Sequence, residues 1–256
     1  DVLGSRGLGD VYKRQANWHA ATTYYWPKQG SLTFFAYSPK TIASHAGFSY
    51  DKEGITLNGW DINANPNVDF MVADIAKNKR GNEDNYAYNG VPTLFRHKLA
   101  RVSVKAKLDD AYENKTINLT SMELTNIKTK GNYVNNNWTG QGAPENIQVY
   151  NDASGLLLNK DAAIEIGTQK RIVMPQALAQ DAYFKIKYNL TTTIAGGGTD
   201  TQLIEKDILI KNVTPAWYTN NDITYTLIIS LGTNYIEFDT SVTDWVGYGN
   251  MDLTIE

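Results

Sequence analysis

The strongest constraint on the fold is a pair of alternating apolar and polar stretches between Leu94 and Gly131. In the first stretch, apolar residues occupy every second position from Ala100 to Leu108, and Arg, Ser and Lys lie between them. A period of two places alternate side chains on opposite faces of a strand. The pattern therefore predicts a strand with one face buried and the other in solvent.

The second stretch follows a polar connection and changes phase in its middle. Its apolar positions fall into two sets separated by Thr120-Ser121, namely Ile117 and Leu119, then Met122, Leu124 and Ile127. One extra residue in a strand produces such a shift, so the sequence predicts a β-bulge there. We expect the two stretches to pair as a hairpin that is aliphatic on one face and basic on the other, as is typical of a β-sandwich.

Short runs of the same kind recur along the chain, between turns rich in Gly, Asn, Asp and Pro. They lie near residues 32–37, 54–57, 70–73, 147–150, 155–158, 171–174, 183–190, 203–210, 224–230, 235–238 and 245–255. Sixteen Tyr and six Trp residues also favour strands. Many short strands without a convincing amphipathic helix predict an all-β sandwich and not a parallel α/β sheet.

Several segments carry a family resemblance. The first is F-x-H-x-L-A-R-V-S-V-K-A-K from Phe95, followed by L-T-S-x-x-L-x-N-I-K-T-K-G-x-Y from Leu119. Others occur in matching order, namely Tyr24–Pro27, Leu32–Pro39, Asp69–Asp74, Tyr225–Ser230, Ile236–Asp239 and Ser241–Trp245. From about Trp18 to the C-terminus, the sequence resembles the fimbrillin (Mfa-like or FimA-like) family, the pilus subunits of type V fimbriae in Bacteroidales.

This resemblance implies two transthyretin-like β-sandwich domains in tandem. With a boundary near Gly90, the expected domains are residues 16–90, an incomplete N-terminal sandwich, and residues 91–256, the C-terminal sandwich. Residues 1–15 match neither the strand pattern nor the family, and we expect a non-native leader or sequence artefact on a chain truncated at its N-terminal side. A disordered native leader and a protease site at Lys13-Arg14 are the alternatives.

The resemblance also implies a function. Fimbrillins are exported as lipoproteins and polymerise by donor-strand exchange, in which an extended segment of one subunit completes a sheet of the next. The expected partners are other fimbrial subunits and a host or bacterial surface ligand, and the expected location is the cell-surface fimbria or the outer membrane, the latter through a lipidated leader absent from this sequence. The donor or tail strand would carry Val246, Tyr248, Met251, Leu253 and Ile255. The same segment is equally consistent with the last strand of its own domain.

Charge and cysteine content exclude several other classes of protein. The chain has no Cys, so it has neither a disulfide framework nor a thiolate metal site. With 24 basic and 27 acidic residues, its net charge of -3 provides no general attraction to nucleic acid. No apolar segment approaches the roughly 20 residues of a membrane-spanning helix. We expect no cofactor, no metal and no nucleic-acid partner.

The sequence gives no catalytic pattern. His19, His45 and His97 are far apart and form no H-x-H or H-E-x-x-H pair, and there is no G-x-S-x-G elbow. We therefore predict that the protein is not an enzyme, an interpretation that only convergence of His97 with an acidic residue in a pocket would reopen. Gly196–Gly198 lacks the Lys-Ser/Thr of a phosphate loop and favours a hairpin tip.

Two polar segments suggest ligands. Asp61, Asn63 and Asn65 have the spacing that begins a calcium loop, but an ordinary Asn-rich turn fits better because the Gly and distal Glu of that loop are missing. Trp138 lies in an Asn- and Gly-rich segment, where an exposed ring would contact a sugar or a partner, although a ring folded back over the sandwich is more typical. The alternative function is accordingly a surface carbohydrate-binding lipoprotein that uses loop aromatics.

Overall fold

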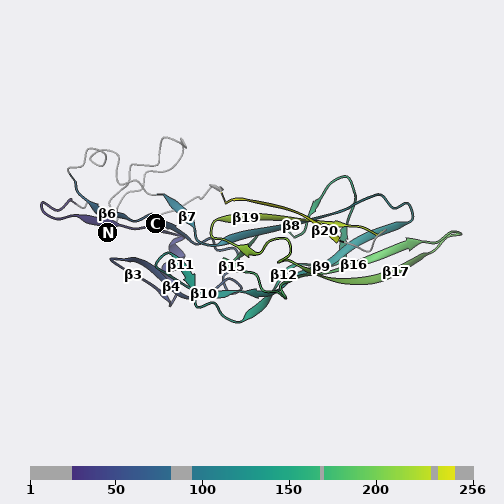
Figure 1. The fold of residues 1–256 in the computed structure, drawn as a ribbon, viewed down its shortest axis with the longest axis horizontal. Coiled ribbons are helices and arrows are strands. Elements are labelled where there is room, and N and C mark those ends of the chain that lie inside the picture. Colours follow the sequence, from purple (N-terminus) through teal and green to yellow (C-terminus); the bar gives the residue numbers. More distant parts are fainter. Residues whose placement is uncertain (1–24, 82–93, 168–169, 232–235, 246–256) are drawn as a thin grey trace. The chain divides into compact units, whose positions relative to one another are not determined.

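A computed structural model of the chain describes residues 25–81, 94–167, 170–231 and 236–245, and these residues form an all-β fold (Figure 1). This confirms the predicted fold class. The described residues group into two compact units. Unit 1 contains the residues up to Gly59 together with Asp69–Lys98 and Asn132–Thr139, and unit 2 contains Trp60–Val68, Leu99–Gly131 and the residues from Gly140 onward. No helix in the described ranges has the length and apolar character needed to cross a membrane.

Unit 1 is built from short strands. One sheet has the order β11-β10-β4-β3, a second has the order β2-β5-β7, and β1 pairs with β6. The strand bounds are β1 Leu32–Phe34, β2 Tyr37–Ser38, β3 Phe48–Asp51, β4 Gly54–Asp61, β5 Met71–Ala73, β6 Ala76–Lys79, β7 Phe95–His97, β10 Lys130–Val134 and β11 Asn137–Thr139, with a 3-10 helix η1 at Lys40–Ser44. The predicted boundary near Gly90 lies outside the described residues, so a division there stays a prediction.

Unit 2 contains two larger sheets. Their orders are β12-β9-β16-β17 and β13-β8-β19-β20, with β14 also pairing with β8, and a separate pair joins β15 to β18. The strand bounds are β8 Ala100–Leu108, β9 Lys115–Lys128, β12 Pro144–Leu157, β13 Ile164–Glu165, β14 Arg171–Val173, β15 Gln176–Ala177, β16 Tyr183–Thr193, β17 Thr199–Leu209, β18 Ala216–Trp217, β19 Asn221–Ile229 and β20 Ile236–Asp244. Runs 147–150 and 155–158, predicted as two strands, belong to the single strand β12.

The core of unit 2 lies between its two sheets. Phe184 on β16 meets Tyr225 on β19 edge to face, with ring centroids 5.0 Å apart. Alternate residues of β8 and β19 are buried, as are the apolar positions of β9. The predicted alternation is therefore confirmed, because each large sheet has one face turned to the core and the other to solvent.

The predicted bulge in β9 is confirmed. Pairing with β16 shifts register between Ser121, opposite Lys187, and Leu119, opposite Tyr188. Thr120 is thus the extra residue, and its hydroxyl donates to the Lys187 carbonyl at 3.1 Å. The shift allows apolar residues on both sides of Thr120 to face the core even though their spacing changes from even to odd.

The predicted hairpin of the two strongest stretches is wrong. The strands β8 and β9 exist, but they belong to different sheets of unit 2. β8 pairs in parallel with β19, while β9 lies between β12 and β16. Their apolar faces therefore serve opposite sides of the core. Adjacent strands in the sequence can contribute to one core without pairing edge to edge.

Candidate functional site

The last described strand, β20, is followed by Trp245, whose backbone and ring are both held by contacts within unit 2. Trp245 follows β20 and is 5% exposed, and its backbone N–H donates to the Asn220 carbonyl at 2.6 Å. The guanidinium carbon of Arg101 lies 4.7 Å from the centre of the Trp245 ring, within the range of a cation–π contact. The predicted donor residues Val246, Tyr248, Met251, Leu253 and Ile255 lie outside the described residues. Trp245 is therefore the last described residue before that segment.

A partly buried carboxylate supports the same anchor. Asp222, next to the start of β19, accepts Arg101 at 2.6 and 3.2 Å and the Lys170 ammonium at 3.0 Å. Burial raises the pKa of Asp222, but the hydrogen bonds from Arg101 and Lys170 lower it by more, so the pKa lies below its usual value. Asp222 thus remains ionised and holds the guanidinium against Trp245.

The Trp138 side chain packs against other residues of unit 1. It lies on β11 opposite Tyr133, because Asn135 and Asn136 make a two-residue turn between β10 and β11. The ring packs edge to face against Phe70 and Tyr133, and its indole N–H donates to the Lys98 carbonyl. This placement favours the interpretation of a ring folded back onto its own sheet. Trp60, near the end of β4, is buried and is 2% exposed.

The two described histidines, His45 and His97, have different partners. His97 contacts the Asp69 carboxylate at 2.8 Å and is 8% exposed, so it does meet an acidic residue. Neither residue lines the cavity described below. The His45 ring instead accepts the Gly47 backbone N–H at 3.1 Å, and His19 lies outside the described residues. No group of three or more His, Cys, Asp or Glu side chains in the described part of the chain is placed to hold a metal ion.

The Asn-rich segment with calcium-like spacing forms a local turn. The Asp61 side chain accepts the Asn63 backbone N–H at 2.9 Å, and the Asn65 side chain donates to the Asp61 carbonyl. The Lys130 ammonium lies 2.6 Å from Glu145 and 3.5 Å from Asp61. A lysine thus stands beside the two carboxylates at the point where a calcium ion would need to bind, which favours the ordinary turn.

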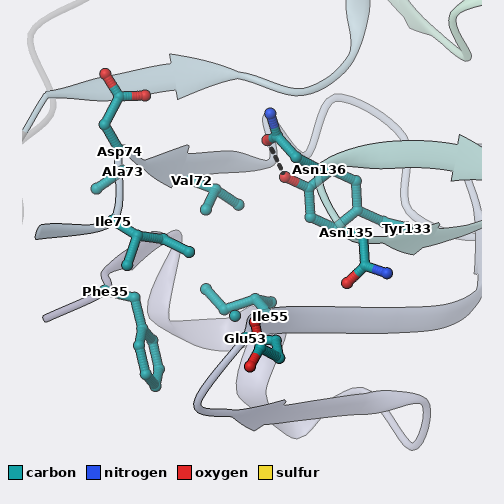
Figure 2. Close-up of a pocket in the computed structure, with 11 residues that line it drawn as sticks. Phe35, Glu53, Ile55, Val72, Ala73, Asp74, Ile75, Tyr133, Asn135 and Asn136 are labelled. Atoms are coloured by element: carbon teal, nitrogen blue, oxygen red, sulfur yellow. Dashed lines mark hydrogen bonds between the residues drawn. The ribbon is translucent and has the colours of Figure 1, made fainter. Parts of the chain in front are cut away.

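A cavity of about 560 Å³ lies within unit 1 (Figure 2). It is lined by residues from the loop after β1, the β3–β4 turn, β5 with the residues after it, and the β10–β11 turn. Ile55, Val72 and Ala73 are buried residues of this lining. Figure 2 shows the Tyr133 hydroxyl at the side of the cavity, where it donates to the Asn136 side-chain oxygen at 2.7 Å. Burial raises the pKa of Tyr133, so the hydroxyl stays protonated.

The sequence did not predict this cavity. Its residues come from separate segments that only the fold brings together, and they share no period or motif. The sequence signal nearest to the cavity is the Asn135-Asn136 pair, because asparagines favour two-residue hairpin turns. In the structure their backbone φ angles of 49° and 66° suit such a turn. We interpreted that segment through Trp138, although the neighbouring asparagines are the residues that line the cavity.

One sequence family and several solved structures are similar to this chain. The sequence model of a family described as fimbrillin-like matches residues 9–245. The fold is similar to a fimbrial protein from Bacteroides vulgatus, with a TM-score of 0.61 and 16% identity over 87% of this chain and 80% of that one. It is also similar to a candidate cell adhesion protein from Bacteroides uniformis, with a TM-score of 0.51 and 21% identity over 90% of this chain and 80% of that one. No curated protein matches the sequence.

Proposed function

Because this chain belongs to the fimbrillin-like family, we propose that it is a structural subunit of a cell-surface fimbria, that it assembles by donor-strand exchange, and that it supports adhesion. The observation that carries the proposal is the anchor at Trp245. The N–H of this residue is bonded to Asn220 and its ring is held by Arg101, so β20 stays with its own unit. The segment that follows is the donor.

The sequence of that segment suits strand addition. At about 3.3 Å per residue, an extended strand with the length of residues 246–256 would reach roughly 35 Å, which exceeds the length of the nine-residue strand β8. Its apolar residues, separated by Gly, Asn, Asp and Thr, supply side-chain anchors for a groove, namely Val246, Tyr248, Met251, Leu253 and Ile255. An open sheet edge offers unpaired N–H and C=O groups, and an added strand satisfies them while burying alternate side chains.

This mode of contact produces a filament. The donor of one subunit and the acceptor of the next are different surfaces, so each added copy presents a new free end. The partners are therefore other fimbrial subunits, with the same or a different sequence, and the location is the cell surface. A structural role of this kind needs neither cofactor nor catalytic group.

The test compares the full chain with a chain that ends at Trp245. Both should fold, because the anchor and both large sheets of unit 2 are retained, and circular dichroism checks this. Size-exclusion chromatography and electron microscopy should show oligomers or filaments only for the full chain. Equal polymerisation of the two chains would remove the donor role from residues 246–256.

A second arm supplies the donor in trans. A labelled peptide with the sequence of residues 246–256 should bind the shortened chain, since its backbone completes an open sheet edge. A control peptide in which Leu253 and Ile255 are replaced by Asp should not bind, because it places charge where apolar side chains must be buried. If both peptides bind equally, the proposed anchors are wrong.

A further inference from the structure

The cavity of unit 1 has the size and composition of a ligand site. Its volume of about 560 Å³ lies within the range of about 300 to 1,000 Å³ that is common for small-molecule sites. Such sites combine an apolar lining with a few polar groups that fix the orientation of a ligand. Both components are present here, on different elements of the same unit.

The backbone around the cavity is already paired, which excludes an added strand as its occupant. β4 lies between β10 and β3, and β5 lies between β2 and β7. Neither strand therefore has a free edge of N–H and C=O groups to offer to an extended peptide. The cavity presents side chains, and the ligand must be recognised by side-chain chemistry.

An aromatic ring pair adjoins the cavity through one of its members, Phe35. Phe35 lines it, and the Phe35 ring lies 5.3 Å from the Tyr50 ring at an interplanar angle of 52°. Phe35 is half-buried and Tyr50 is 64% exposed, so part of this ring pair is accessible. The face of an aromatic ring carries partial negative charge. The C–H groups on the apolar face of a pyranose ring are slightly positive and pack well against it.

Polar groups also line the cavity. The turn at Asn135-Asn136 holds two amides at the rim, and the Tyr133 hydroxyl fixes the oxygen of Asn136, which leaves the Asn136 NH2 group as a donor. Among the described residues, no hydrogen bond holds the exposed side-chain amide of Asn135. Glu53 adds a carboxylate with only two long ionic contacts, at 4.0 Å to Lys52 and to Lys77.

The charge of the lining selects a neutral ligand. Glu53 and Asp74 are its charged residues, and no Lys or Arg is part of it. Arg96 already donates a bidentate pair of hydrogen bonds to the Asp74 carboxylate, at 2.8 and 2.9 Å. Each carboxylate of the lining thus already has a cationic neighbour, Lys52 and Lys77 for Glu53 and Arg96 for Asp74. A phosphate, sulfate or acidic sugar would have to compete with these carboxylates for the cations, whereas hydroxyl groups would find a carboxylate acceptor and amide donors.

From this geometry we infer that the cavity binds a neutral oligosaccharide, with one sugar ring packed on Phe35 and its hydroxyl groups bonded to Glu53, Asn135 and Asn136. The residues of this site all lie in unit 1, and the inference does not depend on strand exchange. It gives the adhesive role a ligand class. It also places sugar recognition away from Trp138, whose ring packs on its own sheet.

The experiment uses the full chain on an array of neutral oligosaccharides with sialylated and phosphorylated counterparts, followed by calorimetric titration with the neutral glycan that binds. Phe35→Ala and the double variant Asn135→Gly with Asn136→Gly should each weaken binding by about tenfold or more, because each removes a set of direct contacts. Glycine tolerates the positive φ angles of the turn, so the double variant removes the amides and keeps the backbone. Tyr218→Ala, which removes an exposed ring of unit 2, is the control and should leave affinity unchanged.

Binding by a chain that ends at Trp245 should equal binding by the full chain, which separates this proposal from the assembly proposal. Circular dichroism and urea unfolding show whether each variant is folded. Three results would overturn the inference, namely no neutral glycan bound, preference for acidic glycans, or equal affinity of the Phe35→Ala variant and the original protein.

Discussion

Arg101 joins Trp245 to Asp222. Its guanidinium carbon lies 4.7 Å from the centre of the Trp245 ring, and one of its nitrogens lies 2.6 Å from the Asp222 carboxylate. A planar guanidinium can stack on a ring and donate in its own plane at the same time, which an ammonium cannot do. The pair of contacts fixes the last described residue of unit 2 against the beginning of β8.

Replacing Arg101 with Lys should therefore destabilise the protein although the charge is kept. We expect a loss of about 1 to 3 kcal/mol in the free energy of unfolding, measured with urea, because the stacked and forked geometry is lost. Arg96→Lys is the matched control, because its pair with Asp74 is about half exposed and should change stability by less than about 1 kcal/mol. Equal effects of the two substitutions would contradict the role given to the stacked guanidinium.

The Asp222 carboxylate should make stability depend on pH. Its pKa in the folded protein is lowered, so its contribution is present above its unfolded pKa of about 3.9 and is lost as the pH falls through the folded value. Between pH 7 and pH 3, the original protein should therefore lose more unfolding free energy than Asp222→Asn. Urea unfolding at both pH values measures the difference. Parallel losses in the two proteins would show that Asp222 does not titrate in this way.

The bulge in β9 predicts an unusual tolerance to deletion. Removing Thr120 places Ile117, Leu119 and Met122 in one regular alternation, so all three keep facing the core, and the cost should be only about 1 to 2 kcal/mol. Removing Glu123 from the same strand should instead turn one end of β9 inside out and unfold unit 2. Circular dichroism and urea unfolding of the two deletions test this, and equal damage would be inconsistent with Thr120 as the extra residue.

The core of unit 2 contains a hydrogen bond between aromatic side chains. The indole N–H of Trp217 donates to the Tyr225 hydroxyl at 2.9 Å, and both side chains are almost fully buried. Tyr225→Phe leaves that N–H without its acceptor and should cost about 1 to 3 kcal/mol. Tyr218→Phe, at a residue that is 65% exposed, should cost less than about 0.5 kcal/mol. Thermal unfolding of the two variants compares them, and a neutral Tyr225→Phe would mean that another group accepts the bond.

Strand positions were predictable because burial imposes a period on the sequence, whereas strand pairing was not. The apolar residues of β8 and β9 alternate in the same way whether the two strands lie in one sheet or face each other across a core. The bulge at Thr120 could be identified because a register change leaves a break in the alternation. The pattern of apolar and polar residues does not show to which sheet each strand belongs.

The cavity could not be predicted from the sequence, for a related reason. Phe35, Glu53, Val72 and Asn135 are far apart in the chain, and only the fold of unit 1 places them around one space. Trp138 attracted attention because it is aromatic and flanked by polar residues. The two-residue turn instead aligns it with Tyr133 across the hairpin, where its ring packs within the unit.

The parallel pairing of β8 with β19 determines when unit 2 can fold during synthesis. Arg101 lies beside Asp222, and the two residues are 121 positions apart in the sequence. At about 5 to 20 residues per second, a ribosome needs roughly 6 to 24 s to make the intervening chain. During that time β8 lacks its parallel partner β19, although its other partners β13 and β14 are made earlier. Unit 2 therefore cannot complete its sandwich until at least that long after β8 has been made.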